Sequence, residues 1–454
     1  MLPDDVLLVI FDFCGNEDET TEVLKAWETL VHVCRRWRSL VFESPRRLNL
    51  QLVCTSAMPA RDTLDVWPAL PLLIRCESDC PMDNVVAVLE HSNRVRRIEL
   101  FGLSCFSLEK FWATMQAPFP ELTDLVLLSD EKKTLPIVPD SLLGGSAPSL
   151  RRLWLGNIPF PGLPKLLLST THLVDLTLWT IPHSGYFSPE DILTALSTLT
   201  SLEILRLEFQ SSLSRPDQER SPPPPTRVVL PALRHFSFVG VSDYLDDLVA
   251  RIDAPRLIEL YITLINQIIF GTPQFIQFIS CTSTLKPVKE ACLVFGDDYV
   301  RVRLSSLKLP FERLDVKVPC RELYWQLSSL DQVCTSCLPL VSTLEELYIS
   351  GDPFWKPNSQ DDIENTLWLN VLQPFIAVKK LYLTKEFAPG IVLALQELVE
   401  GRTIEVLPSL EKIFVEGLQT QGRVPEGLRQ FVATRQASHP IAVSPYKYVR
   451  SKIY

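Results

Sequence analysis

The chain has 454 residues, of which 46% are hydrophobic and 22% are charged, and its formal net charge is −10. This composition predicts a folded chain and argues against disorder. An acidic balance without a long basic run argues against nucleic-acid backbone binding as the main role. The length suggests either two to four domains or one elongated repeat array.

Eleven cysteines are scattered at irregular spacings. The apolar stretch at the N-terminus is interrupted by Asp4, Asp5 and Asp12, and it lacks the basic leader of a secretory signal. The longest apolar run, residues 260–270, is too short to span a bilayer. We therefore expect no membrane association, and mostly buried thiols in a reducing compartment, the cytoplasm or the nucleus.

The first predicted element is a helix over residues 2–13. Asp4 and Asp5 follow Pro3 in its first turn, where the helix dipole favours carboxylates. The apolar residues of this stretch fall on one helical face, which comprises Leu2, Val6, Val9, Ile10 and Phe13.

A second and longer amphipathic pattern follows an acidic gap. Its apolar residues recur at spacings of three and four, and they are Trp27, Leu30, Cys34, Trp37 and Val41. We interpret Arg35, Arg36 and Arg38 as the solvated face of this helix. Val31, Val33 and Leu40 widen the apolar stripe beyond what one packed face needs, so the surplus either docks on the rest of the chain or binds a partner.

A six-residue pattern, with apolar residues at its first, fourth and sixth positions, recurs from residue 93 to residue 418. Twelve copies have middle apolar residues at 98, 125, 153, 176, 205, 236, 260, 291, 314, 347, 381 and 413. Each copy alternates like a short strand, and helix-length stretches such as 188–201 separate the copies. There Ser188 and Pro189 predict an N-cap and a first helical residue. Strand–helix units of this period bury their apolar faces only by stacking into a solenoid.

The repeats resemble leucine-rich repeats, which implies an α/β fold, a right-handed arc of parallel strands and helices. The family usually places Asn or Cys three residues after the second inner apolar position, and no copy here does so. We therefore expect an irregular arc of about twelve repeats. A Pro-rich insertion at 215–227 interrupts the array, residues 46–92 form its junction and N-terminal cap, and residues 419–454 form a C-terminal tail or cap.

In such a solenoid the residue between the two inner apolar positions points to the concave face. Five of these twelve residues are aromatic, and the next outward position adds Phe101 and Trp179. Aromatic side chains dominate protein interfaces, but they also suit β-strands, and both explanations stay open. The candidate substrate-binding residues are Trp154, Trp179, Arg206, Tyr261, Tyr348, Tyr382 and Phe414.

Residues 1–45 resemble an F-box in both order and spacing. The resemblance is carried by Leu2-Pro3, Asp4-Asp5, Ile10-Phe11 and Val33-Cys34-Arg35-Arg36-Trp37, with an acidic insertion at 15–22. An F-box followed by leucine-rich repeats is a familiar architecture, particularly in fungal families. The resemblance implies a substrate-recognition adaptor of an SCF-type (Skp–cullin–F-box) ubiquitin ligase, in which the F-box binds a Skp-type adaptor, and through it a cullin, while the repeats hold a substrate protein.

The positions that match the F-box pattern are the candidates for the Skp-type interface. They are Leu2, Pro3, Val6, Leu7, Ile10, Phe11, Val33, Cys34, Trp37 and Val41. For Trp37 a role in the core of the head stays equally open. The rival hypothesis is a leucine-rich-repeat scaffold or sensor that is not linked to ubiquitination, and packing of Leu2, Pro3, Ile10 and Phe11 against residues 46–92 would favour it.

Catalytic motifs are absent from the sequence. The chain has no GxxxxGK[ST], GxGxxG, HExxH or GxSxG, so we expect a non-catalytic protein without a cofactor. The pair Cys334 and Cys337 has no second CxxC, and Cys76 with Cys80 is a looser pair, so buried thiols are favoured over a metal site.

Overall fold

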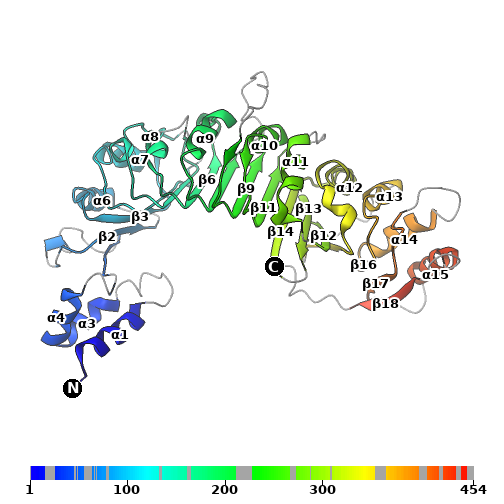
Figure 1. Cartoon of the computed structure of the whole chain (residues 1–454), viewed down its shortest axis with the longest axis horizontal. Coiled ribbons are helices and arrows are strands. Elements are labelled where there is room, and N and C mark those ends of the chain that lie inside the picture. The colour runs from blue at the N-terminus through cyan, green and yellow to red at the C-terminus, as the bar shows by residue number, and fades with distance from the viewer. Residues whose placement is uncertain are drawn as a thin grey trace. The chain divides into compact units, whose positions relative to one another are not determined.

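The structure is a computed structural model of the whole chain (Figure 1). It describes residues 2–15, 26–44, 48, 50–55, 64–65, 67, 69–77, 81–131, 135–160, 165–210, 227–265, 272–286, 288–306, 309–352, 365–397, 406–418, 423–435 and 441–446. Contacts divide the chain into two compact units, Met1–Ile204 and Leu205–Tyr454. The Pro-rich insertion at 215–226 lies outside the described residues, as does the tail beyond residue 446.

The first unit begins with a small helical head. Its helices are α1 (Asp4–Gly15), α3 (Ala26–Val33) and α4 (Arg35–Glu43). The side chains of Leu7, Phe11, Val31 and Val41 are almost completely buried between these helices. The single long helix expected over 27–41 is instead two helices. Cys34 separates them, because it adopts an extended conformation and its Sγ accepts a hydrogen bond from the backbone N–H of Trp37 at 3.5 Å.

The rest of the first unit is a parallel sheet with helices on one face (Figure 1). Its strands, in spatial order, are β1 (Leu52–Cys54), β2 (Leu72–Cys76), β3 (Val95–Leu100), β4 (Asp124–Leu128), β5 (Arg152–Gly156) and β6 (Asp175–Ile181). The connecting helices are α6 (Met82–Leu89), α7 (Cys105–Thr114), η1 (Leu142–Gly145), α8 (Lys165–Ser169), η2 (His183–Gly185) and α9 (Pro189–Leu196).

The predicted repeat anchors pair with one another across the strands. Ile98 lies opposite Leu125, Leu125 opposite Leu153, and Leu153 opposite Leu176. All four side chains are fully buried, so the repeat period of the sequence matches the strand register of the sheet. This repeated parallel strand–helix arrangement is a leucine-rich-repeat-like α/β fold.

Local signals account for individual elements of this unit. The predicted N-cap at Ser188 is confirmed: its hydroxyl accepts from the N–H of Asp191, and the Asp191 carboxylate accepts from the N–H of Ser188 at 3.0 Å. Asn157 adopts a positive φ of 56° and donates to the carbonyls of Ser129 and Glu131 at 3.3 and 2.7 Å. A single asparagine thus links neighbouring repeats where the sequence has no regular ladder.

The second unit repeats the same plan over more strands. Its main sheet has the spatial order β7 (Ile204–Phe209), β9 (His235–Gly240), β11 (Glu259–Leu264), β14 (Leu309–Pro319), β13 (Tyr299–Ser306), β12 (Glu290–Phe295), β15 (Glu346–Gly351), β16 (Lys380–Leu383), β17 (Lys412–Glu416) and β18 (Ala442–Tyr446). A small parallel pair joins β8 (Val228–Val229) and β10 (Ile252–Asp253).

Helices connect these strands on one side of the sheet, as α10, α11 and α12 show in Figure 1. They are α10 (Ser242–Val249), α11 (Pro273–Cys281), η3 (Ser283–Leu285), α12 (Leu323–Gln332), the π-helical turn η4 (Val333–Cys337), η5 (Pro339–Thr343), α13 (Asn365–Leu372), α14 (Ala388–Glu397) and α15 (Arg423–Arg435). Strand β18 pairs in parallel with β17, so residues 442–446 belong to the sheet.

The regular order breaks at strands β12 to β14. The sequence predicts the copies around residues 291 and 314 as successive parallel neighbours, but the structure reverses them. Strand β14 pairs with β11, strand β12 pairs with β15, and β13 lies between them, antiparallel to both. After β11 the chain skips two strand positions and forms β12 at the third. It then returns as β13 and β14, which fill the two positions between β12 and β11, before α12 leads to β15. The antiparallel strand β13 contributes a row of side chains that no repeat copy predicts.

Candidate binding surfaces

Helix α1 presents two apolar faces. One face, with Leu7, Leu8 and Phe11, is buried in the head. The other remains at the surface, with side chains between 42% and 75% exposed, and comprises Leu2, Val6, Val9, Ile10 and Phe13. We call these five residues the α1 face. They are the residues that the sequence places on one helical face.

The residues matched to the F-box pattern divide in the same way. Those at the surface are Leu2, Pro3, Val6, Ile10, Val33 and Cys34. Leu7, Phe11 and Val41 form the core of the head. Trp37 is partly exposed and packs edge-on against Phe11, with ring centroids 4.8 Å apart. Six of the ten candidates are therefore accessible to a partner, and the other four support them from beneath.

Arg36 fastens the start of the chain to helix α4. Its Nε and Nη2 donate to Oδ1 of Asp4 at 3.1 and 2.6 Å, and Nη2 also donates to the carbonyl of Leu2 at 2.6 Å. Arg38 donates to the carbonyl of Val31 at 2.9 Å. Arg38 is exposed and Arg36 is partly exposed, as expected for a solvated helix face, but each of them also holds another segment.

The head contacts the junction through Trp27. The indole N–H of Trp27 donates to the carbonyl of Gln51 at 3.0 Å, and its ring contacts that of Trp67 at 5.3 Å between centroids. Helix α4 also contacts the junction, since the ring centroid of Phe42 lies 6.3 Å from that of Trp67.

The open face of each sheet, opposite the helices, carries the candidate substrate-binding residues. In the first unit Trp154 lies on β5 and Trp179 on β6, and Trp179 is 47% exposed. Close by, Asp124 lies 3.6 Å from both Arg97 and Arg152, so a ladder of alternating charge crosses β3 to β5. Arg206, on β7, is exposed.

In the second unit the strand register arranges one continuous row across the open face. Reading from β9 to β18, the row comprises Ser237, Tyr261, Asp315, Arg303, Cys292, Tyr348, Tyr382, Phe414 and Ser444. Four of the predicted residues lie in this row. Tyr348, Tyr382 and Phe414 are brought together, whereas the strands β14, β13 and β12 separate Tyr261 from them.

Tyr348, Tyr382 and Phe414 form an aromatic stack. The rings of Tyr348 and Tyr382 are 4.2 Å apart and nearly parallel, and Phe414 continues the stack at 4.6 Å. Glu346, the first residue of β15, fixes the position of the stack. Its carboxylate accepts hydrogen bonds from the hydroxyl of Tyr348 at 2.9 Å and from Nζ of Lys380 at 2.7 Å. Burial, followed by the charge of Glu346, raises the pKa of Tyr348, so its phenol stays protonated.

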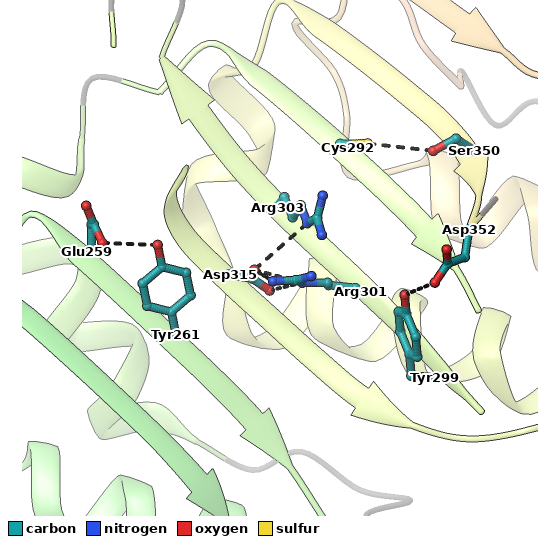
Figure 2. Close-up of polar contacts among 9 residues, drawn as sticks. All are labelled: Glu259, Tyr261, Cys292, Tyr299, Arg301, Arg303, Asp315, Ser350 and Asp352. Carbon is teal, nitrogen blue, oxygen red and sulfur yellow. Dashed lines mark hydrogen bonds and ion pairs between the residues drawn. The ribbon is translucent and has the colours of Figure 1, made fainter. Parts of the chain in front are cut away.

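Next to this stack, strand β13 contributes a polar cluster (Figure 2). Nε of Arg301 donates to both carboxylate oxygens of Asp315 at 2.7 Å, and Nε of Arg303 lies 3.9 Å from the same carboxylate. We call these three residues the arginine cluster. Figure 2 also shows Tyr299 turned toward Asp352, to which its hydroxyl donates at 2.6 Å.

The environment of Tyr299 is electrostatically unusual. Nζ of Lys317 lies 4.1 Å from the centroid of its ring. Burial, together with the hydrogen bond to Asp352, raises the pKa of Tyr299 to about 12. This phenol therefore remains a hydrogen-bond donor throughout the physiological range.

Sequence reasoning missed Tyr299, Arg301 and Arg303 because β13 is not a copy of the repeat. Its signal was nevertheless present, since Val300, Val302 and Leu304 alternate with polar residues after the turn-forming residues 296–298. Strict alternation of apolar and polar residues is typical of a half-buried strand.

The cysteines differ from the sequence expectation. Cys76 is disulfide-bonded, so the prediction of a thiol there is wrong. Cys34 and Cys281 are exposed thiols, whereas Cys334 is buried as expected. Within the described part of the chain, no group of three His, Cys, Asp or Glu residues could hold a metal ion. No described helix is long and apolar enough to cross a bilayer.

Comparison with known proteins adds little. No protein-family model matches the chain, and no curated protein matches it. Among solved structures, it is similar to the leucine-rich repeat-containing protein LegL7 from Legionella pneumophila, at 10% identity over 84% of this chain and 97% of that chain. The TM-score is 0.25, which is too low to establish a common fold.

Proposed function

We propose that this chain is the substrate-recognition adaptor of an SCF-type ubiquitin ligase. The head binds a Skp-type adaptor, which links it to a cullin, and the repeats bind a substrate protein. The chain itself is non-catalytic and needs no cofactor, because the partner subunits carry out ubiquitin transfer. It works in the cytoplasm or the nucleus, without nucleic-acid or membrane binding.

The observation that carries this proposal is the exposed α1 face. An isolated head gains nothing from presenting five large apolar side chains to water, since each buried CH₂ contributes about 0.8 kcal/mol. Exposed apolar stripes of this kind mark surfaces for partner helices. The face includes Leu2 and Ile10, which belong to the Leu-Pro and Ile-Phe pairs of the F-box resemblance.

Co-expression with a Skp-type adaptor, followed by co-purification at moderate salt, tests the proposal. The variant Ile10→Asp places a carboxylate in the α1 face without touching the buried side of the helix. The matched control is Ile137→Asp, because Ile137 is similarly exposed but lies outside the head. We expect the wild type and the control to retain the adaptor and Ile10→Asp to lose it.

Circular dichroism verifies that each chain is folded. Failure of a well-folded wild type to retain the adaptor, or retention by Ile10→Asp equal to the control, rules out the adaptor role. The second candidate function is then a leucine-rich-repeat-like protein-binding scaffold or sensor. The aromatic stack and the arginine cluster favour it, because both lie on the open face of the second unit and neither depends on the head.

A further inference from the structure

We propose that residues 447–454, which follow strand β18, dock on the open face of strands β15 to β18 and cover the aromatic stack. A partner protein that binds this face must then displace them. The docking itself does not depend on the ligase role, and only its regulatory consequence rests on the proposed binding of a substrate by the repeats.

The first argument is the position at which the described chain leaves the sheet. Strand β18 pairs with β17, and its last residue, Tyr446, lies opposite Glu416. The ring of Tyr446 reaches past β17 and lies edge-on to the ring of Tyr382 on β16, with the ring centroids 5.4 Å apart. Residues 447–454 therefore begin beside the aromatic stack, on the side of the sheet that carries it.

The second argument is the burial of polar side chains next to the stack. Ser350 and Thr384 follow Tyr348 and Tyr382 by two residues, so they lie on the same face of the sheet. Their side chains are only 2% and 6% exposed, although serine and threonine are mostly exposed in folded proteins. The Oγ1 atom of Thr384 is buried and has no hydrogen-bond partner in the described part of the chain. A docked segment would supply a cover for these side chains and a backbone carbonyl for this hydroxyl.

The third argument is charge. Residues 447–454 carry three basic side chains and no acidic one, although the whole chain has a net charge of −10. At the carboxyl ends of β15 to β17 the described charged residues are Asp352, Glu386 and Glu416 against Lys385. The other described open-face charges of these strands are Glu346 and Lys380, which pair at 2.7 Å, and Lys412. The end of the face next to residue 447 is therefore acidic.

Glu416 is the carboxylate best placed to receive a basic side chain of this segment. It lies opposite Tyr446, the residue after which the segment starts. Its carboxylate accepts from the backbone N–H of Lys385 at a distance of 3.4 Å, and no described lysine or arginine forms an ion pair with it. Lys447, Arg450 and Lys452 are the basic residues that follow.

The fourth argument is length. Neighbouring strands are about 4.8 Å apart, so the distance from β18 to β15 is about 14 Å. An extended chain rises about 3.3 Å per residue, so roughly four or five residues cover this distance. Residues 447–454 are therefore long enough to cross the stack, and their apolar side chains are Tyr448, Val449, Ile453 and Tyr454. The arginine cluster lies on β13 and β14, beyond β12, and takes no part in this docking.

The test uses a chain that ends at residue 446 and a fluorescein-labelled synthetic peptide of residues 447–454. Fluorescence polarisation measures the affinity of the peptide, and of a peptide with the same residues in scrambled order, for the truncated chain and for the full chain. Tyr382→Thr in the truncated chain removes the middle ring of the stack. The matched control is Tyr261→Thr, because Tyr261 lies in the same row on β11, outside the stack.

We expect the truncated chain to bind the peptide at least about tenfold more tightly than the full chain, because a tethered segment competes at an effective concentration in the millimolar range. Tyr382→Thr should weaken binding about tenfold or more, and Tyr261→Thr should leave it unchanged. Glu416→Gln should weaken binding and reduce its dependence on salt. If circular dichroism shows that truncation unfolds the chain, the full-length double variant Tyr448→Ser, Val449→Ser replaces it, and it should bind the peptide more tightly than the full chain.

No peptide binding by the truncated chain, equal binding by the truncated and full chains, equal binding of the scrambled peptide, or an unchanged affinity in Tyr382→Thr overturns the proposal. Co-purification with the Skp-type adaptor is measured on the same chains. Loss of adaptor capture with peptide binding as expected contradicts only the ligase role. Adaptor capture without peptide binding contradicts only this inference.

Discussion

At the scale of single residues, Arg36 links the beginning of the chain to the helix that follows the break at Cys34. It holds the backbone of Leu2 and the carboxylate of Asp4, and both flank the exposed α1 face. Because the pair with Asp4 is exposed, its contribution to the free energy of unfolding is small, below about 1 kcal/mol. If the head binds a Skp-type adaptor as proposed, the role of Arg36 is to position the α1 face.

We predict that Arg36→Ala weakens capture of a Skp-type adaptor without unfolding the head. Arg36→Lys should restore only part of the binding, because an ammonium lacks the planar fork that reaches two acceptors at once. Hydrogen exchange followed by mass spectrometry should show faster exchange in the first turn of α1. The control is Arg35→Ala, which alters an exposed neighbour. Equal exchange in the two variants would contradict a positioning role for Arg36.

Tyr299 supplies a prediction about pH. Its pKa is raised to about 12 in the folded chain, above the ordinary value of 10. The folded state thus binds this proton more tightly than the unfolded state does. The corresponding stabilisation is complete below pH 10 and disappears as the pH rises through about 12.

Tyr299→Phe should therefore unfold more easily than the wild type at pH 8, by about 1 kcal/mol for the lost hydrogen bond to Asp352. The difference in the free energy of unfolding between the two proteins should shrink between pH 10 and pH 12. Urea denaturation at several pH values measures it. A difference that stays constant across this range would show that Tyr299 does not titrate as described.

At the scale of elements, the reversal of β12 to β14 depends on a tight turn between β12 and β13. Gly296 donates its N–H to the carbonyl of Tyr299 at 2.8 Å, and the ring of Tyr299 folds back over it. A Cβ at Gly296 would lie 2.5 Å from Cε1 of that ring. The glycine is needed because of this close approach.

Gly296→Ala should lower the free energy of unfolding by about 1–3 kcal/mol, as overpacking does elsewhere. A double-mutant cycle with Tyr299→Ala checks the cause. If the clash with the ring is responsible, Gly296→Ala should cost much less in the Tyr299→Ala background, whereas an equal cost in both backgrounds would point to the backbone instead.

The same elements show how far the sequence predicts the fold. The repeat pattern identifies the paired residues, since Leu347, Leu381 and Ile413 lie opposite one another in the second unit as their spacing predicts. The capping box at Ser188 is equally local and was predictable. The strand order around Ala291 and Leu314 was not, because which strand pairs with β11 depends on contacts far apart in the sequence.

In the candidate sites, too, local features were predictable from the sequence and features that depend on distant contacts were not. The α1 face was predictable, because helical periodicity places Val6, Ile10 and Phe13 together. That Phe11 and Val41 would form the core was not, since the pattern does not say which of two apolar faces meets the neighbouring helices. The arginine cluster was missed because it depends on the antiparallel strand β13.

At the scale of the whole molecule, the two proposed binding surfaces belong to different compact units, Met1–Ile204 and Leu205–Tyr454. Mutations at sites without shared partners usually act additively. We therefore predict that, in the chain that ends at residue 446, Ile10→Asp abolishes adaptor capture and leaves the affinity for the 447–454 peptide unchanged. Tyr382→Thr should have the opposite effects, and the double variant should combine both losses.

Fluorescence polarisation with the 447–454 peptide and the chain that ends at residue 446, measured in the presence and absence of a saturating Skp-type adaptor, provides the check. Independent surfaces give one peptide affinity under both conditions. If the adaptor shifts the peptide affinity of this chain, then by thermodynamic reciprocity the peptide must shift the adaptor affinity by the same factor. Such a shift, lost in Ile10→Asp, would contradict independence and show that binding at the head is communicated to the repeats.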